Sequence, residues 1–184
     1  MEVLKLLDGI VDVYLPDLKY AGNEEGFLYS KVRSYASVSR AAIAEMHRQM
    51  GNELVYSDDG LLQRGLVIRL LVLPNDIGAV NESLRWIHAE LSPRVAISLM
   101  AQYYPTNVAG TNQRYVLLSR RIRETEWMNA VAALEELGMQ EGWMQEYDGA
   151  SFYYRPDFSD RETPFRDVRD FTLIGEAGPS LPDR

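Results

Sequence analysis

An acidic and a basic side chain directly follow a mostly apolar run near the start of this sequence. The run covers residues 10–15, and its β-branched residues predict a buried strand that ends before Pro16. Asp17 and Lys19 come next, two positions apart, so an extended backbone directs both side chains to the same side. Barrels and open α/β sheets place reactive side chains at the carboxyl ends of parallel strands. A salt bridge that only closes the strand explains the same spacing equally well.

Two later apolar runs also carry polar side chains. Residues 66–73 predict a strand buried on both faces, and Arg69 interrupts it. A charge in such a strand is rarely buried without a partner. Residues 95–100 predict a third buried strand that leads into Tyr103 and Tyr104. These tyrosines are suited either to stack on an adenine ring or to pack as a pair.

Helical periodicity and turn residues predict the elements around these strands. The predicted helices are residues 2–7, 40–50, 81–91 and 124–137, with loops at 21–32 and 110–113, an extended piece at 114–118 and a short strand at 143–145. Asp59-Gly60 predicts a small β-hairpin insertion. Arg120, Arg121 and Arg123 either grip an anion or form a solvated lead-in to the last helix, balanced by its acidic residues.

The alternating order of strands and helices predicts an α/β fold with a parallel sheet and right-handed α crossovers. Three principal strands are too few to close a barrel, so we expect a partial TIM-type (β/α) barrel fragment or an open sheet with a raw edge. Residues 1–147 form the predicted domain. Residues 148–184 are rich in Pro, Asp, Arg and Gly and predict an irregular tail.

Composition limits the kinds of partner. The chain has 184 residues, of which 46% are hydrophobic, and a net charge of −8. Nucleic-acid-binding surfaces need clustered Lys and Arg, so this charge argues against a nucleic-acid partner. No apolar run reaches the ~20 residues of a membrane span. Residues 1–9 do not resemble a signal peptide. We therefore expect a cytoplasmic protein without a membrane partner.

The sequence contains no cysteine. Disulfides, thiolate catalysis, thiolate zinc sites and iron–sulfur ligation by Cys are therefore excluded within this chain. The two histidines, His47 and His88, fall in different predicted helices, and we do not expect a metal site that uses both.

Three segments resemble the later strands of radical S-adenosylmethionine enzymes, and especially the relatives of pyruvate formate-lyase-activating enzyme. The segments are Tyr14-Leu-Pro-Asp-Leu-Lys-Tyr, Gly65-Leu-Val-Ile-Arg-Leu-Leu-Val-Leu-Pro and Leu99-Met-Ala-Gln-Tyr-Tyr-Pro. Their order and spacing also fit, and the resemblance covers residues 4–145.

The resemblance implies a partial (β/α)6 barrel. In that family a 4Fe-4S cluster, held by a Cys-x3-Cys-x2-Cys loop, binds and cleaves S-adenosylmethionine, and the radical formed abstracts hydrogen from a glycine of a partner enzyme. By position, Asp17, Lys19 and Arg69 would line the cofactor side of the barrel. In this chain, the resemblance implies that Arg69 is partly hydrated or paired with Asp17. Tyr104 falls near a His that lies beside the cofactor in activating enzymes, and Leu70 stands where close relatives often carry His.

The missing cysteines imply that this chain alone is inactive and binds no cofactor. It resembles the C-terminal half of such an enzyme, whose partners would be the missing N-terminal half-barrel and a glycyl-radical enzyme. An exposed interior face or strand edge predicts self-association. Two alternatives remain: a degenerate half-barrel that serves as a binding module without redox activity, and an unrelated α/β sheet in which Asp17 and Lys19 are only structural.

Overall fold

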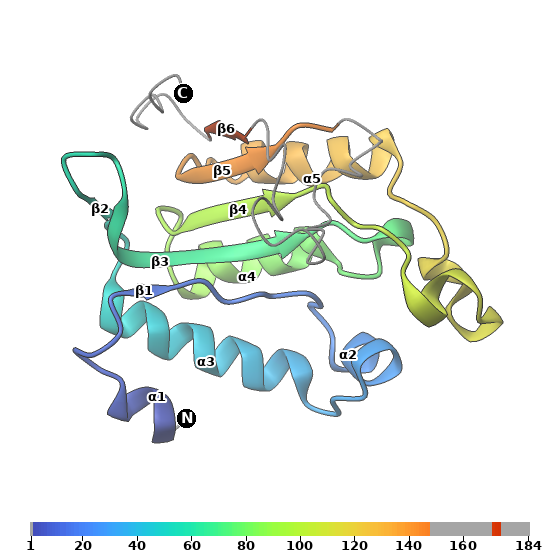
Figure 1. Ribbon diagram of the computed structural model, residues 1–184, viewed down its shortest axis with the longest axis horizontal. Coiled ribbons are helices and arrows are strands. Elements are labelled where there is room, and N and C mark those ends of the chain that lie inside the picture. The colour runs from blue at the N-terminus through green and yellow to red at the C-terminus, as the bar shows by residue number, and fades with distance from the viewer. Residues whose placement is uncertain (1, 148–170, 174–184) are drawn as a thin grey trace, which may run out of the picture.

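Four parallel strands form the centre of the fold. The computed structural model describes residues 2–147 and 171–173, and within them one six-stranded sheet has the order β1-β3-β4-β5-β6, with β2 paired to β3 (Figure 1). β6 and β2 each run antiparallel to their neighbour. The strands are β1 (Val13–Tyr14), β2 (Val55–Tyr56), β3 (Leu62–Leu71), β4 (Ala96–Met100), β5 (Gly142–Gln145) and β6 (Phe171–Leu173).

The long helices connect successive parallel strands. α3 (Tyr35–Met50) leads from β1 to β3, α4 (Val80–Glu90) from β3 to β4, and α5 (Glu124–Glu136) from β4 to β5. All three lie on the same side of the sheet (Figure 1). The shorter helical elements are α1 (Glu2–Leu6), α2 (Asn23–Ser30), η1 (Pro74–Asp76), η2 (Asn107–Gly110) and η3 (Gln113–Leu118), the last three being 3₁₀ helices.

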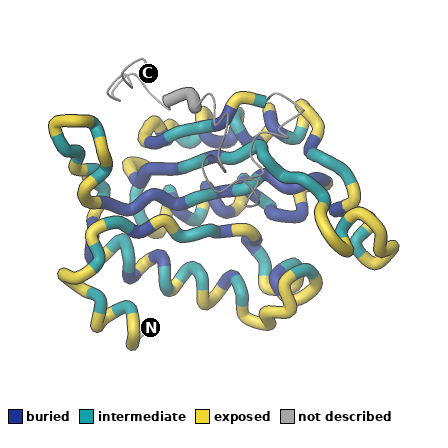
Figure 2. Tube along the Cα trace, in the orientation of Figure 1, coloured by how far each residue is buried: buried dark blue, intermediate teal, exposed yellow. Residues whose placement is uncertain are grey.

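The two faces of the sheet differ in burial, because side chains alternate along each strand. Ile68 and Leu70 of β3 are fully buried in the hydrophobic core with Leu84 and Ile87 of α4. Arg69 of β3 and Ser98 of β4 have the opposite parity and are only partly buried. Figure 2 shows this burial along the strands and on the inner sides of the helices. The core therefore lies between the sheet and one layer of helices.

The predicted α/β class and its parallel strands are confirmed. The helices predicted at 2–7, 81–91 and 124–137 and the strand at 143–145 match α1, α4, α5 and β5 to within one residue at each end. The predicted hairpin is also present: β2 pairs antiparallel with β3. In its turn, the Gly60 amide donates to the Ser57 carbonyl over 2.9 Å.

Several predicted boundaries are wrong. Residues 21–32 contain α2 rather than a loop, and residues 114–118 belong to η3 rather than to an extended piece. The apolar residues of α2 do not follow helical spacing, so periodicity gave no signal. Instead, Gly26 brings α2 against α3, where any Cβ would overlap the Tyr35 side chain. In η3, the Asn112 carboxamide caps the turn by accepting from the Arg114 amide over 2.9 Å.

The strands also differ from their predicted extents. β1 covers only Val13–Tyr14, and α3 begins five residues before the predicted start at residue 40. β3 begins four residues before the predicted strand at 66–73 and runs without a break through Gly65 (φ 148°). Residues 171–173 lie in the predicted irregular tail, yet they form β6. The rest of that tail, 148–170 and 174–184, lies outside the described residues.

Gly142 lies where β5 begins, opposite Ile97 of β4. Its φ is 116°, and a Cβ there would overlap the backbone of Ile97. Gly142→Ala should therefore cost about 3 kcal/mol or more in the free energy of unfolding, measured by urea titration. Gly9→Ala is the matched control, because Gly9 (φ 76°) has open space around it and meets only the backbone strain, about 1 kcal/mol. Equal losses for the two variants would contradict the close approach of β4 and β5.

Candidate functional site

A row of side chains crosses the sheet on the face opposite the helices. Asp17, just beyond β1, forms a bridge with Arg69 of β3. Arg69 is paired in turn with Ser98 of β4, and Ser98 is paired with Trp143 of β5. Directly paired residues in a parallel sheet point to the same face. This row has the parity opposite to Ile68 and Leu70, which are buried against the helices. It also lies toward the carboxyl ends of β1 and β3, where α/β proteins place their sites.

Asp17, Arg69 and Lys19 form the charged end of this row. The Arg69 Nε donates to Asp17 Oδ1 over 2.7 Å, and a terminal guanidinium nitrogen lies 2.7 Å from the same oxygen. The Lys19 Nζ lies 3.6 Å from Asp17 Oδ2. The predicted pairing of Arg69 with Asp17 is thus confirmed, and Lys19 joins it.

These three side chains remain partly open to solvent. Asp17 is 32%, Arg69 42% and Lys19 47% exposed. At such exposure, ion pairs contribute at most about 1 kcal/mol, because water screens both charges. A ligand carboxylate or hydroxyl can therefore exchange places with one of these contacts at small cost to the fold.

The backbone around Asp17 is held independently of its charge. The Leu18 amide donates to the Arg69 carbonyl over 3.0 Å, and the Arg69 amide donates to the Pro16 carbonyl over 2.9 Å. The Tyr35 hydroxyl accepts from the Lys19 amide over 2.9 Å and donates to the Asp17 carbonyl over 3.4 Å. Sequence reasoning missed Tyr35 because it lies before the predicted start of its helix.

Tyr104, the fourth predicted site residue, follows β4. Its ring centroid lies 4.8 Å from the guanidinium carbon of Arg121. The neighbouring Tyr103 donates its hydroxyl to the Leu118 carbonyl over 2.7 Å, and burial raises the pKa of Tyr103 to about 12. The segment after β4 is thus attached to η3 and to the approach to α5. Gln145 also holds it, accepting from the Ala101 amide over 2.7 Å.

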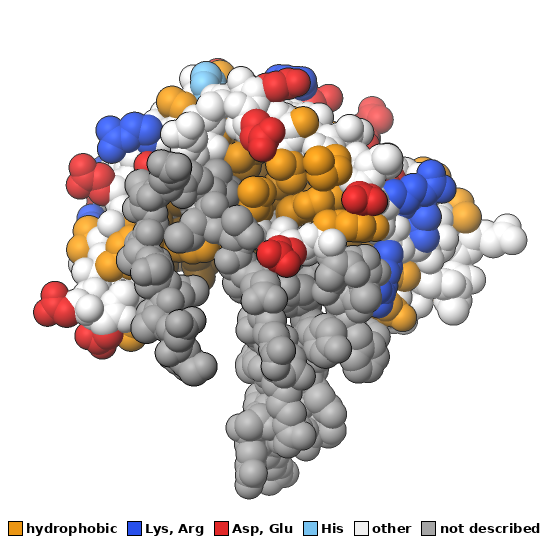
Figure 3. Space-filling view, turned by 90° about the horizontal axis from the view of Figure 1, so that it is seen from above, with side chains coloured by type: hydrophobic (Ala, Val, Ile, Leu, Met, Phe, Trp, Pro, Cys, Tyr) orange, Lys and Arg blue, Asp and Glu red, His pale blue; other side chains and the backbone are white. Residues whose placement is uncertain are grey.

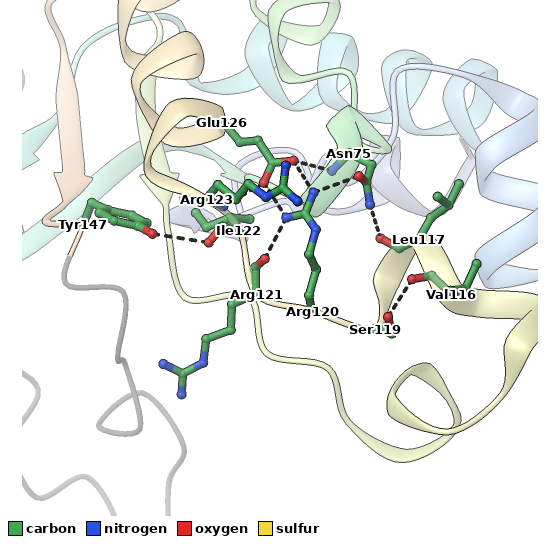
Figure 4. Close-up of polar contacts among 10 residues, drawn as sticks. All are labelled: Asn75, Val116, Leu117, Ser119, Arg120, Arg121, Ile122, Arg123, Glu126 and Tyr147. Atoms are coloured by element: carbon green, nitrogen blue, oxygen red, sulfur yellow. Dashed lines mark hydrogen bonds and ion pairs between the residues drawn. The ribbon is translucent and has the colours of Figure 1, made fainter.

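A polar cluster joins the loop after β3 to the start of α5 (Figure 4). Arg120 donates to both carboxylate oxygens of Glu126, over 2.8 and 2.7 Å. The backbone amides of Asn75 and Arg123 each donate to Glu126 over 2.7 Å. The hydrogen bonds from Arg120 are the largest cause that lowers the pKa of Glu126 to about 2. For Arg120, the predicted lead-in balanced by acidic residues is therefore the better of the two interpretations.

The donor set limits which cofactors this chain can hold. Within the described residues, no group of three or more His, Cys, Asp and Glu side chains is placed to hold a metal ion. The chain has no thiolate for an iron–sulfur cluster. The charged cluster offers a ligand one carboxylate, Asp17, beside two cations, Arg69 and Lys19.

No helix in the part of the chain that the structure describes is long and apolar enough to cross a membrane.

The fold and this row define an α/β protein with a mostly parallel sheet, helices on one face and a charged cluster at the carboxyl ends of the first two parallel strands. No family model matches the sequence, and no solved structure matches it. An uncharacterized protein of the archaeon Methanocaldococcus jannaschii is 28% identical over 139 residues. The match covers 76% of this chain and 36% of that protein, so the chain spans about a third of the curated relative's length.

Glu126→Gln should lower the free energy of unfolding by about 2 kcal/mol at neutral pH, a value discounted for partial exposure. A carboxyl whose pKa falls from 4.5 to about 2 on folding stabilises the fold above pH 4.5. This contribution is lost as the pH falls toward 2. The difference between wild type and variant should therefore shrink between pH 4.5 and 2 in urea titrations.

Glu124→Gln is the matched control, since Glu124 is exposed in the same first turn of α5. It should change the unfolding free energy by less than about 0.5 kcal/mol. A difference between wild type and Glu126→Gln that stays constant down to pH 2 would contradict the role given to the Glu126 carboxylate.

Proposed function

We propose that this chain is the C-terminal, cofactor-contacting part of a radical S-adenosylmethionine enzyme of the activating type, which generates a glycyl radical in a partner protein. The observation that carries the proposal is the cluster of Asp17, Lys19 and Arg69 at the carboxyl ends of β1 and β3. It lies on the sheet face opposite α3, α4 and α5, which corresponds to the interior of a (β/α) barrel.

The chemistry of this cluster fits one part of S-adenosylmethionine. The cofactor carries a carboxylate, which Arg69 and Lys19 would bind. It also carries hydroxyls, which would donate hydrogen bonds to the Asp17 carboxylate. When bound and reduced, the cofactor supplies a radical that removes a hydrogen atom from substrate. The residues of this chain would bind and orient it; the 4Fe-4S cluster has no ligand here, because the chain contains no cysteine.

We further propose that β1, β3, β4 and β5 are an arc of a (β/α)6 barrel. Successive strands with their helices on one side are the repeating unit of such barrels, which supports this arrangement. The cluster loop and the remaining strands would come from an upstream half. The relative in Methanocaldococcus jannaschii is longer than the matched region, since only 36% of it is covered.

A binding module without redox activity is the second candidate function, and the absence of cysteine favours it. One experiment separates the two. The chain is expressed together with its upstream coding sequence, iron and sulfide are reconstituted anaerobically, and reductive cleavage of S-adenosylmethionine to 5′-deoxyadenosine is measured. Cleavage is expected for the enzyme. Absence of cleavage in a protein that has taken up the cluster would contradict the enzyme proposal.

In the same protein, Arg69→Leu should weaken the binding of S-adenosylmethionine about tenfold, because a carboxylate contact is lost. Binding is measured by isothermal titration calorimetry. Arg85→Leu, an exposed arginine on α4, is the matched control and should leave the affinity unchanged. Equal affinities for the two variants would show that Arg69 does not contact the cofactor.

The same proposal predicts self-association, because an isolated arc leaves its interior face without the other half. Sedimentation equilibrium should show dimers or larger species as the protein concentration rises. Trp143→Glu on that face should shift the equilibrium toward monomer. Met128→Glu, which places the same charge at an exposed position of α5, should not. A monomer at every concentration would contradict this prediction.

A further inference from the structure

Positive and negative charges are segregated along this chain. Residues 26–44 and 91–123 contain eight of its 19 Lys and Arg residues and none of its 27 Asp and Glu residues. In a protein of net charge −8, such acid-free segments are the places where a negatively charged partner is not repelled.

The structure brings the two segments together. The ring of Tyr29 in α2 lies 6.2 Å from the ring of Tyr115 in η3, and the Lys31 Nζ lies 5.8 Å from the Tyr115 centroid. α2 and η3 therefore share one surface at one end of the molecule. Figure 1 shows α2 and the 3₁₀ segments at the same end of the molecule, and Figure 3, seen from above, shows basic side chains beside hydrophobic ones toward that end.

This α2–η3 surface exposes apolar side chains among its cations. Phe27 is 43%, Val32 45% and Val116 60% exposed. Lys31, Arg33 and Arg114 are also exposed, and the Arg33 guanidinium carbon lies 4.9 Å from the Phe27 ring centroid. We define the α2–η3 surface by these residues: Phe27, Lys31, Val32, Arg33, Arg114 and Val116. Exposed apolar side chains beside cations are typical of interaction sites. The acidic residues of α2, Glu24 and Glu25, lie in its first turn, at the opposite end of the helix from Lys31 and Arg33.

Lys31 occupies a position that favours glycine. It ends α2 in the left-handed conformation (φ 61°), and its amide donates to the Phe27 carbonyl over 3.1 Å. Glycine is the residue most often found at such a helix end, and any other residue costs about 1 kcal/mol there. Lys31 carries this backbone cost, and the hydrogen bond from its Nζ to the Leu28 carbonyl, over 2.8 Å, offsets part of it.

We infer that the α2–η3 surface docks an acidic segment of a partner protein that also carries apolar side chains. Carboxylates of that segment would pair with Lys31, Arg33 and Arg114, and its apolar residues would cover Phe27, Val32 and Val116. With a net charge of −8, the chain repels a polyanionic nucleic-acid strand over the rest of its surface, which favours a short acidic protein segment. This inference rests on the described surface and does not depend on the proposed radical chemistry.

The surface also connects to the candidate site. Tyr29 lies 6.2 Å from Tyr20, and Tyr20 lies 5.1 Å from Tyr35, measured between ring centroids. Tyr35 in turn bonds to the backbone of Asp17 and Lys19. A partner on this surface would therefore dock on the same packed aromatic group that positions the charged cluster.

The test uses a fluorescent amphipathic peptide of Glu and Leu, a matched peptide with Gln in place of Glu, and anisotropy measured at low and high salt. Lys31→Glu with Arg33→Glu should weaken binding of the acidic peptide about tenfold. Arg85→Glu with Arg94→Glu makes the same change in net charge at exposed positions elsewhere and should weaken it about twofold or less. Lys31→Gly, which suits the left-handed backbone but removes the charge, should weaken binding without destabilising the fold.

Three outcomes would overturn the inference. The first is an equal loss of binding in the two charge-reversed double variants. The second is a Gln peptide that binds as tightly as the Glu peptide. The third is tighter binding of phosphatidylglycerol vesicles or of a polythymidine oligonucleotide than of the acidic peptide, with that binding also lost in the Lys31→Glu, Arg33→Glu variant.

Discussion

A guanidinium in the middle of a core strand must be paired or hydrated, and much of this structure is arranged around that requirement. Asp17 pairs with Arg69, and the backbone bonds of Pro16 and Leu18 to Arg69 extend the contact between the first two parallel strands beyond the two residues of β1. Tyr35 then holds the Asp17 backbone from α3. The charged cluster is thus fixed by main-chain bonds, while its side chains keep contact with water.

Because the long helices cover only one face of the sheet, the charged cluster lies on the other face. α3, α4 and α5 bury one face of the sheet, and the row from Asp17 to Trp143 occupies the other. Near the carboxyl ends of β3 and β4, the Glu126 carboxylate accepts hydrogen bonds from Arg120 and from the backbone amides of Asn75 and Arg123. The loops that follow β3 and β4 are therefore anchored, which preserves the geometry of the carboxyl ends where the cluster lies.

The sequence predicted the parts of the fold that rest on local periodicity. The buried strands around Ile68 and Ile97 and the helix that begins at Glu124 have strong apolar patterns, and the structure has them. That Arg69 needs a partner was also predictable, because a charge in a buried strand is rarely left unpaired, but its identity as Asp17 came from the family resemblance. α2 was not, because its position depends on the contact of Gly26 with Tyr35, which is distant in sequence. The charge-segregated α2–η3 surface needed the same tertiary information, since only the structure brings Tyr29 to Tyr115.

The central claim is that Asp17, Lys19 and Arg69 are one wall of a cofactor site whose other wall lies in a different stretch of protein. The nucleotide sequence upstream of the Met1 codon tests this claim most directly. The account predicts an in-frame coding sequence with a strand followed by Cys-x3-Cys-x2-Cys, or a neighbouring gene that encodes it. An in-frame stop codon, with no such motif in the adjacent genes, would contradict the account.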